Sequence, residues 1–288
     1  MPLEWDREGR DWPLREHSRF VAAGPVTFHV QRLGVGPPLL LIHGTAASTH
    51  SWRDVAPLLA QNFDVISLDL PGHGFTRGVP PGGLTLGGMA GALARLTQEL
   101  GVQPVLVAAH SAGTAIACRM ALDGTVEGPI VGFGAALLPM GGAAAPIFSG
   151  LAKLLLLNPF AASWISRIAR RPGRVDRFLV QATGSTIDRR GAELYARLFA
   201  SPGHCAGAVE MMARWDLAAL AKALPKLPVP LHLAHGTKDS AVPIAEAERA
   251  ARSAGGDLQR LAGLGHLAHE EQPEQAAGIV RAAAGERR

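Results

Sequence analysis

Short apolar runs alternate with helical segments along most of this chain, and that alternation constrains the fold more than any other feature. Continuous apolar runs of this kind are typical of strands that are buried on both faces. A strand, a helix and a further strand in repeated succession predict a mostly parallel sheet with helices on both faces. The predicted strands are 37–44, 63–74, 104–111, 128–139, 228–236 and 257–262, and the predicted helices are 51–62, 84–101, 112–124, 243–254 and 273–284.

Two segments depart from the alternation. Residues 18–34 are typical of an antiparallel hairpin that turns at Gly24-Pro25, at one edge of the sheet. Residues 140–220 have a helical composition without a strand pattern, and a structureless loop of that length is implausible. We therefore predict an α/β fold with an eight-stranded type of mostly parallel sheet. Its core comprises 1–139 and 221–288, and a helical cap, 140–220, is inserted into it.

A serine stands at the junction between the predicted strand 104–111 and the helix that follows, in the run AHSAG. A very tight strand-to-helix turn requires small residues two positions before and two positions after the serine, and Ala109 and Gly113 are both small. The pattern matches the G-x-S-x-G nucleophile elbow, with alanine in place of the first glycine. The start of the helix would favour negative charge beside the serine. We predict that Ser111 is a nucleophile; the alternative is an ordinary serine in a tight turn.

A serine nucleophile needs a base, and the base needs an acid that orients it. Asp239 follows a predicted strand and is the one carboxylate between Asp216 and Glu246. His266 lies in a glycine-flanked loop after the last predicted strand, and His269 competes with it from a position nearer the next helix. We predict Asp239 as the acid and His266 as the base, in the chain order serine, aspartate, histidine.

A tetrahedral intermediate also needs donors for its oxyanion. We expect one from the backbone N–H of Ala112, directly after the nucleophile, and one from the loop 42–48. In that loop Thr45 is the favoured donor and Ala46 the alternative, while His43 is expected to shape the loop by hydrogen bonding.

The predicted cap combines apolar residues with cations and has no acidic residue from 140 to 175. A pocket of this kind suits a flat hydrophobic ligand with carboxylates, such as a porphyrin, and it equally suits an anionic membrane surface. Alternatively, the apolar residues seal the cap onto the core and the cations are solvated. The cations are Lys153, Arg167, Arg170, Arg171 and Arg174, and the candidate pocket residues are His110, Phe148, Trp164 and Trp215.

Composition excludes several classes of function. The formal charge of +4 comes from scattered basic residues without a nucleic-acid motif. Neither a metal-ligand spacing nor a nucleotide-binding glycine pattern is present, so we predict no metal and no cofactor. Cys118 and Cys205 are expected to be buried, unpaired residues. The charged N-terminus lacks an apolar signal segment, which predicts a cytoplasmic protein. Residues 147–169 are expected to form a buried or interfacial helix pair.

Five motifs together resemble those of α/β-hydrolases. They are the AHSAG elbow, the loop with His43-Gly44, the DLPGHG turn, and the loops that contain Asp239 and His266. Segments from DWPLREHSRFV near the N-terminus to GLGHLAHEEQP near the C-terminus are similar to the BchO family of magnesium-chelatase accessory proteins. This resemblance implies a place in bacteriochlorophyll biosynthesis, near magnesium insertion into protoporphyrin, and carries over Ser111, Asp239 and His266. Ala109, and Thr114 after the elbow, depart from the usual pattern.

Three functions remain open at this point. The first is a serine hydrolase that cleaves an ester bond. The second is a non-catalytic scaffold that binds a tetrapyrrole or assists magnesium chelatase, and the third is a carboxylesterase unrelated to pigments. The expected partners are an apolar or tetrapyrrole-like ligand, magnesium chelatase and, through the cap, the surface of a membrane, but no nucleic acid.

Overall fold

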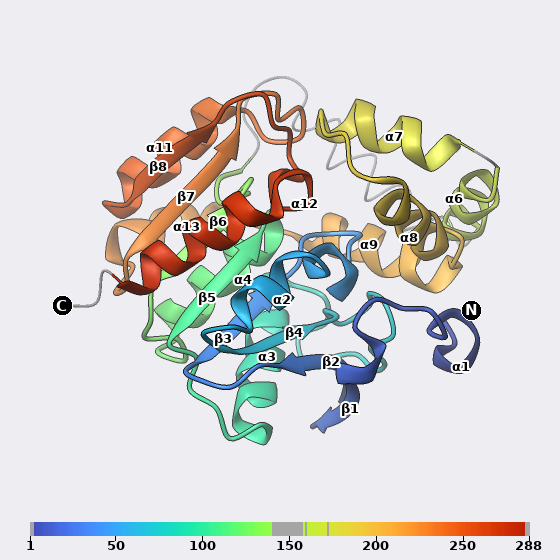
Figure 1. The fold of residues 1–288 in the computed structure, drawn as a ribbon, viewed down its shortest axis with the longest axis horizontal. Helices are drawn as coiled ribbons and strands as arrows, with labels where there is room; N and C mark the ends of the chain where they lie inside the picture. Colours follow the sequence, from blue (N-terminus) through green and yellow to red (C-terminus); the bar gives the residue numbers. More distant parts are fainter. Residues whose placement is uncertain (1–2, 140–157, 159, 172, 286–288) are drawn as a thin grey trace.

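A computed structural model describes residues 3–139, 158, 160–171 and 173–285. Its strands form one sheet in the order β1-β2-β4-β3-β5-β6-β7-β8 (Figure 1). β2 pairs antiparallel with β1 and with β4, and the remaining pairs are parallel. The predicted fold class is thereby confirmed. The strands are β1 (Ser18–Ala23), β2 (Val26–Leu33), β3 (Pro38–Ile42), β4 (Asp64–Leu68), β5 (Leu106–His110), β6 (Ile130–Phe133), β7 (Leu231–Gly236) and β8 (Asp257–Leu261).

Helices cover both faces of the sheet and divide the hydrophobic core into two layers. One layer lies under α3 (Leu86–Glu99), α4 (Ala112–Leu122) and α11 (Ile244–Ala254). The other lies under α2 (Val55–Leu59), α12 (Ala268–Glu271) and α13 (Pro273–Gly285). β3 and β5 are buried almost throughout because both of their faces meet a core layer, which explains their continuous apolar sequence.

Five further helices occupy the described part of the predicted cap and its C-terminal border. They are α6 (Ala161–Ala169), α7 (Arg174–Thr183), α8 (Arg189–Phe199), α9 (Pro202–Arg214) and α10 (Ala218–Ala223). Figure 1 shows α6 to α9 gathered on one side of the molecule, with α6 and α7 at its margin. The division into a core and a cap stays a prediction. Phe148 and Lys153, and most of the expected helix pair at 147–169, lie outside the described residues.

Short helices complete the described chain. They are α1 (Trp5–Glu8) and the 3-10 turns η1 (Arg15–His17), η2 (Thr49–Trp52) and η3 (Leu224–Lys226). No helix among the described residues is long and apolar enough to cross a membrane. Cys118 and Cys205 are buried and unpaired, as predicted.

Several predicted elements are shorter in the structure, among them the strand expected at 63–74, which is β4 alone. The helix expected at 51–62 becomes η2 followed by α2, which begins only at Val55. Pro57 explains this start, because proline is tolerated in a first turn but would clash with the preceding turn in a longer helix. The strand expected at 128–139 is β6 alone, since the chain turns at Gly134, where φ is +52°.

The parallel strands bring several loops to one edge of the sheet. β3, β5, β6, β7 and β8 run in the same direction, so the segments after them emerge together. In α/β sheets this carboxyl edge is where ligands bind. Each candidate residue of the predicted active site follows one of these strands.

Candidate active site

Ser111 lies on a strained turn between β5 and α4. Its backbone angles are φ 51° and ψ −120°, a region that residues other than glycine rarely adopt and that costs about 1–3 kcal/mol. The Ser111 N–H donates to the carbonyl of Phe133 at 2.9 Å, and the Ser111 carbonyl accepts from Ala136 N–H at 3.3 Å. These bonds, to the last residue of β6 and to the segment that follows it, hold the turn in place.

Gly113 makes this turn possible. A Cβ at Gly113 would lie 2.6 Å from the carbonyl oxygens of both Ile42 and His43. Real Cβ atoms essentially never come so close to backbone, so the residue two positions after the serine must be glycine unless β3 shifts. The sequence argument for small residues around Ser111 therefore has a direct steric cause.

Asp239 and His266 form a buried pair after β7 and β8. Asp239 Oδ2 lies 2.8 Å from His266 Nδ1, and the two side chains are 1% and 9% exposed. Asp239 Oδ1 accepts from the N–H groups of Ala241 and Val242 at 2.8 and 2.9 Å. With both oxygens occupied in this way, the carboxylate orients the imidazole, and its hydrogen bond assigns the proton to Nδ1. Nε2 is then free to accept a proton.

The segment after β6 brings the serine turn and the histidine loop together. It bonds the backbone of Ser111, and a Cβ at Gly134 would lie only 2.8 Å from His266 Nδ1. His110, directly before the serine, donates from Nε2 to the His266 carbonyl at 3.1 Å. Their rings are 4.7 Å apart. Burial, reinforced by His269 and His266, holds the pKa of His110 well below its usual value, so His110 is a neutral support for the loop.

His269, the competing base, lies in the core layer below the site. It is fully buried, and its ring lies tilted against those of Trp52 and His110, with ring centroids 4.6 Å apart in both pairs. Neither ring nitrogen has a hydrogen-bond partner among the described residues. Burial, together with the charges of His266 and Arg53, lowers its pKa to about 3. This geometry favours His266 over His269 as the base.

A second imidazole contacts the same acid, and the sequence reasoning missed it. His235 Nε2 donates to the Val242 carbonyl at 2.9 Å and lies 3.3 Å from Asp239 Oδ2. His235 is on β7, four residues before Asp239. His232 and His235 are three residues apart on β7, so their side chains point to opposite faces of the sheet. Only the loop at 239–242 decides that one of them reaches the acid.

The two candidate oxyanion donors flank Ser111. Ala112 is the first residue of α4, where a backbone N–H has no acceptor within the helix. Thr45 lies in the loop after β3, and no acceptor in the described part of the chain takes its N–H. A Cβ at Gly44 would lie 3.0 Å from Ser111 Cβ, so this loop passes directly beside the serine. Both donors stay predictions.

Two buried histidines hold the loop after β3. His43 donates from Nδ1 to the Gly44 carbonyl at 2.7 Å and accepts from Leu70 N–H at 2.9 Å on Nε2. His204 of α9 donates from Nε2 to the Ala46 carbonyl and accepts from Gly74 N–H on Nδ1, both at 3.1 Å. Burial lowers the pKa of His204 to about 4. Both rings are thus neutral cross-links between this loop and the turn after β4.

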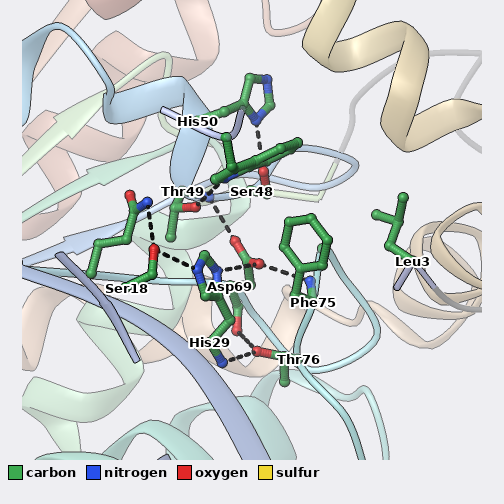
Figure 2. A network of polar contacts seen from close by, with 12 residues as sticks. Leu3, Ser18, His29, Ser48, Thr49, His50, Asp69, Phe75 and Thr76 are labelled. Atoms are coloured by element: carbon green, nitrogen blue, oxygen red, sulfur yellow. Dashed lines mark hydrogen bonds and ion pairs between the residues drawn. The ribbon is translucent and has the colours of Figure 1, made fainter. Parts of the chain in front are cut away.

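Asp69 is the third support of the loop. It is fully buried, and Figure 2 shows it at the centre of a network of polar contacts. Its carboxylate accepts from Thr49 N–H at 2.7 Å and from Phe75 N–H at 2.8 Å, and it contacts His29 Nδ1 at 2.8 Å. Burial opposes ionisation, but His29 and the Phe75 N–H outweigh it and hold the pKa of Asp69 below its usual range. The Ser18 hydroxyl lies 3.1 Å from His29 Nε2. Asp69 thus has a structural role, as an anchor of the loop after β3.

The end of α7 is hydrogen-bonded to the loops that carry the histidine and the acid. The Thr183 carbonyl accepts from His266 N–H at 2.8 Å and from Ser240 N–H at 3.5 Å. Ser185 Oγ accepts from Leu267 N–H at 2.8 Å. The sequence holds no signal for these contacts, because each joins residues that lie far apart along the chain, 82 positions in the case of Ser185 and Leu267.

The candidate pocket residues separate in space. His110 is beside His266, whereas Trp215 is half-buried against the core layer under α3 and α4. Trp164 is 61% exposed on α6 and lines a groove between α6 and α7. Within the described residues, no group of three or more His, Cys, Asp and Glu side chains could hold a metal ion.

The sequence profile of the alpha/beta hydrolase family matches residues 39–279, and the chain belongs to this family. It is also 39% identical over 273 residues to the magnesium-chelatase 30 kDa subunit of Rhodobacter capsulatus, covering 94% of this chain and 95% of that protein. The predicted resemblance to the magnesium-chelatase accessory family is thereby confirmed.

Solved structures share the fold over nearly the whole chain. An epoxide hydrolase determined without ligand has a TM-score of 0.78 at 24% identity, covering 94% of this chain and 99% of that one. A thermophilic esterase from Thermogutta terrifontis has a TM-score of 0.72 at 23% identity, covering 92% and 97%. At this identity the likeness concerns the fold alone.

Proposed function

We propose that this chain is a serine hydrolase that cleaves an ester bond, with Ser111 as nucleophile, His266 as base and Asp239 as its orienting acid. The observation that carries the proposal is the strained Ser111 turn, bonded to the same segment that packs against His266, while Asp239 holds the far nitrogen of that imidazole. A strained backbone at a serine is otherwise an unexplained cost.

The reaction follows from this arrangement. Ser111 Oγ attacks the ester carbonyl carbon while His266 Nε2 takes its proton, and the N–H groups of Ala112 and Thr45 stabilise the resulting oxyanion. The intermediate collapses as His266 returns the proton to the leaving alcohol. Water, deprotonated by His266, then attacks the acyl-enzyme, and the acid leaves as Ser111 regains its proton.

The substrate class is inferred from the relative. A chain similar over nearly its whole length is named as a subunit of magnesium chelatase. We therefore assign this protein to (bacterio)chlorophyll biosynthesis, in the cytoplasm, with a tetrapyrrole-like ester as substrate and magnesium chelatase as the associated enzyme.

A fluorophosphonate probe tests the nucleophile. The wild-type protein should be labelled, Ser111→Ala should not, and magnesium protoporphyrin should suppress labelling if the pigment occupies the same cleft. Ser51→Ala is a matched control, because the Ser51 hydroxyl is buried after β3 and donates to the Ser48 carbonyl, away from the predicted nucleophile. Absence of labelling in the folded wild-type protein would contradict the proposal.

The name of the relative also favours a second candidate function, a scaffold that assists magnesium chelatase without catalysis. Under this alternative Ser111→Ala supports chelation by the chelatase as well as the wild-type protein does. Under the hydrolase proposal it does not, so the same variant separates the two functions.

A further inference from the structure

Helices α6 and α7 expose large aromatic side chains. Phe160, just before α6, Trp164 on α6 and Phe178 on α7 are 76%, 61% and 54% exposed. In the rest of the described chain, Phe20 is the one other exposed Phe or Trp. Soluble proteins seldom leave large apolar patches open to water unless the patch contacts a partner or a membrane.

The same segment accounts for the net positive charge of the protein. Residues 158–183 hold five arginines and one aspartate, so their formal charge of +4 equals that of the whole chain. The remainder of the sequence contains as many cations as anions. Arg167, Arg171, Arg174 and Arg177 form no ion pair with any carboxylate in the described residues. Their charge is therefore available to an anionic surface.

Two of the exposed aromatic rings and two of the arginines line the same groove. Trp164, Ile168, Arg174, Arg177 and Phe178 all line a groove of about 530 Å³ between the two helices. Figure 1 places α6 and α7 at the margin of the molecule, away from the sheet. The groove side chains can therefore meet a flat surface together.

We propose that the α6–α7 face, which carries Trp164, Arg174, Arg177 and Phe178, docks onto an anionic phospholipid bilayer. Trp and Phe rings enter the headgroup region, while arginine stems lie along apolar surface and their guanidinium groups meet lipid phosphates. The helices have nine and ten residues, too few to span a bilayer, so the protein lies on its surface. A second copy of the chain is disfavoured as the occupant, because the same cluster of arginines would meet itself.

Vesicle sedimentation tests the proposal. Wild-type protein should bind phosphatidylcholine vesicles that contain phosphatidylglycerol, and added salt or omission of phosphatidylglycerol should weaken binding. Arg177→Glu/Phe178→Ser should weaken it at least about tenfold. Arg19→Glu/Phe20→Ser, the same dipeptide exposed on β1, is the matched control and should bind like the wild type.

Tryptophan quenching locates the contact. Trp164 is the one exposed tryptophan in the described residues, so brominated phosphatidylglycerol should quench fluorescence in the wild type and much less in Trp164→Phe. Ser111→Ala should bind vesicles normally, which keeps this test separate from the hydrolase proposal. Three outcomes would each overturn the proposal. Vesicle binding would not depend on phosphatidylglycerol, both double variants would lose binding equally, or the protein would form a dimer that only Arg177→Glu/Phe178→Ser dissociates.

Discussion

His266 Nδ1 lies 2.8 Å from Asp239 Oδ2, although the two residues are 27 positions apart in sequence, with α11 and β8 between them. The contact depends on parallel pairing of β7 with β8, which brings both following loops to one edge. The other carboxylate oxygen is held by two backbone N–H groups, so the carboxylate cannot rotate freely.

Asp239→Asn should lower kcat toward an activated ester by about 10³- to 10⁴-fold with little loss of stability. The amide would keep its oxygen on the backbone N–H groups and turn its NH₂ toward His266, which then holds its proton on the wrong nitrogen. Ester hydrolysis and thermal unfolding measure the two effects. Asp257→Asn is the control, because Asp257 pairs with His232 at 2.6 Å on the far part of the sheet and should leave kcat unchanged.

Gly113→Ala and Gly91→Ala should change stability in opposite directions. A methyl group at Gly113 meets two backbone carbonyls, whereas a methyl group at Gly91, exposed on α3, meets nothing within 4 Å. We expect Gly91→Ala to raise the free energy of unfolding by about 0.5–1 kcal/mol, since alanine is the better helix former. Gly113→Ala should lower it and abolish probe labelling. Equal effects in denaturant titrations would contradict the steric argument.

Acidification should destabilise the protein partly through His269. Its pKa is about 3 in the folded state and about 6.5 in the unfolded chain, so between these values only the unfolded chain takes up the proton. The contribution of His269 to the free energy of unfolding is therefore fully present above about pH 6.5 and decreases as the pH drops. At pH 5 the loss is about 2 kcal/mol.

His269→Leu should therefore flatten the pH dependence of unfolding between pH 7 and pH 5 by about 2 kcal/mol. Burial raises the pKa of Glu270 to about 7, although Arg53 and Tyr195 favour its ionised form. In both proteins Glu270 therefore makes the free energy of unfolding change with pH in the direction opposite to His269. Comparing urea unfolding of variant and wild type removes that common part. Parallel curves would show that His269 does not titrate in this way.

Arg53→Met should destabilise the protein by about 3–5 kcal/mol, because it leaves a buried carboxylate without its cation. Arg53 is 6% exposed at the side chain and contacts Glu270 at 2.9 Å, and Tyr195 of α8 donates to the same carboxylate at 2.8 Å. The folded state of the variant must hold Glu270 protonated, so its stability should fall further as the pH rises above 7.

Arg53→Met/Glu270→Gln should recover at least half of the loss and remove its pH dependence. Arg119→Met serves as the control, since Arg119 and its partner Asp123 are 44% and 38% exposed and should contribute within about 1 kcal/mol. Chemical denaturation at pH 6 and pH 9 provides the comparison. A double variant no more stable than Arg53→Met would mean that the charge of Glu270 is not the cause.

Ser185→Ala should lower both kcat and stability, the latter by about 1–3 kcal/mol, because Leu267 N–H loses a buried acceptor directly beside His266. The Thr183 carbonyl would still hold His266 N–H, so activity should fall rather than vanish. Ser163→Ala, on an exposed position of α6, should change neither quantity. Unaltered kcat in Ser185→Ala would show that the end of α7 does not position the histidine loop.

Local sequence was sufficient for the order of strands and helices. Apolar runs such as LLLI in β3 and LVAA in β5 are buried on both faces, and Gly113 and Gly134 stand where backbone conformation or close packing demands a small residue. The helix at 51–62 and the strand at 128–139 were predicted too long, because Pro57 and Gly134 act on the chain at single positions that a smooth apolar pattern hides.

The sequence by itself determined the fold class and the candidates Ser111, Asp239 and His266, because a tight turn and loops after parallel strands leave local signals. The tertiary structure alone decided that His235 also reaches Asp239, that His204 and Asp69 hold the loop after β3, and that Ser185 supports the histidine loop. Each of these contacts joins residues from different elements. Their side chains and backbone groups meet only after the sheet and the helices around it have packed, so no periodicity along the chain could reveal them.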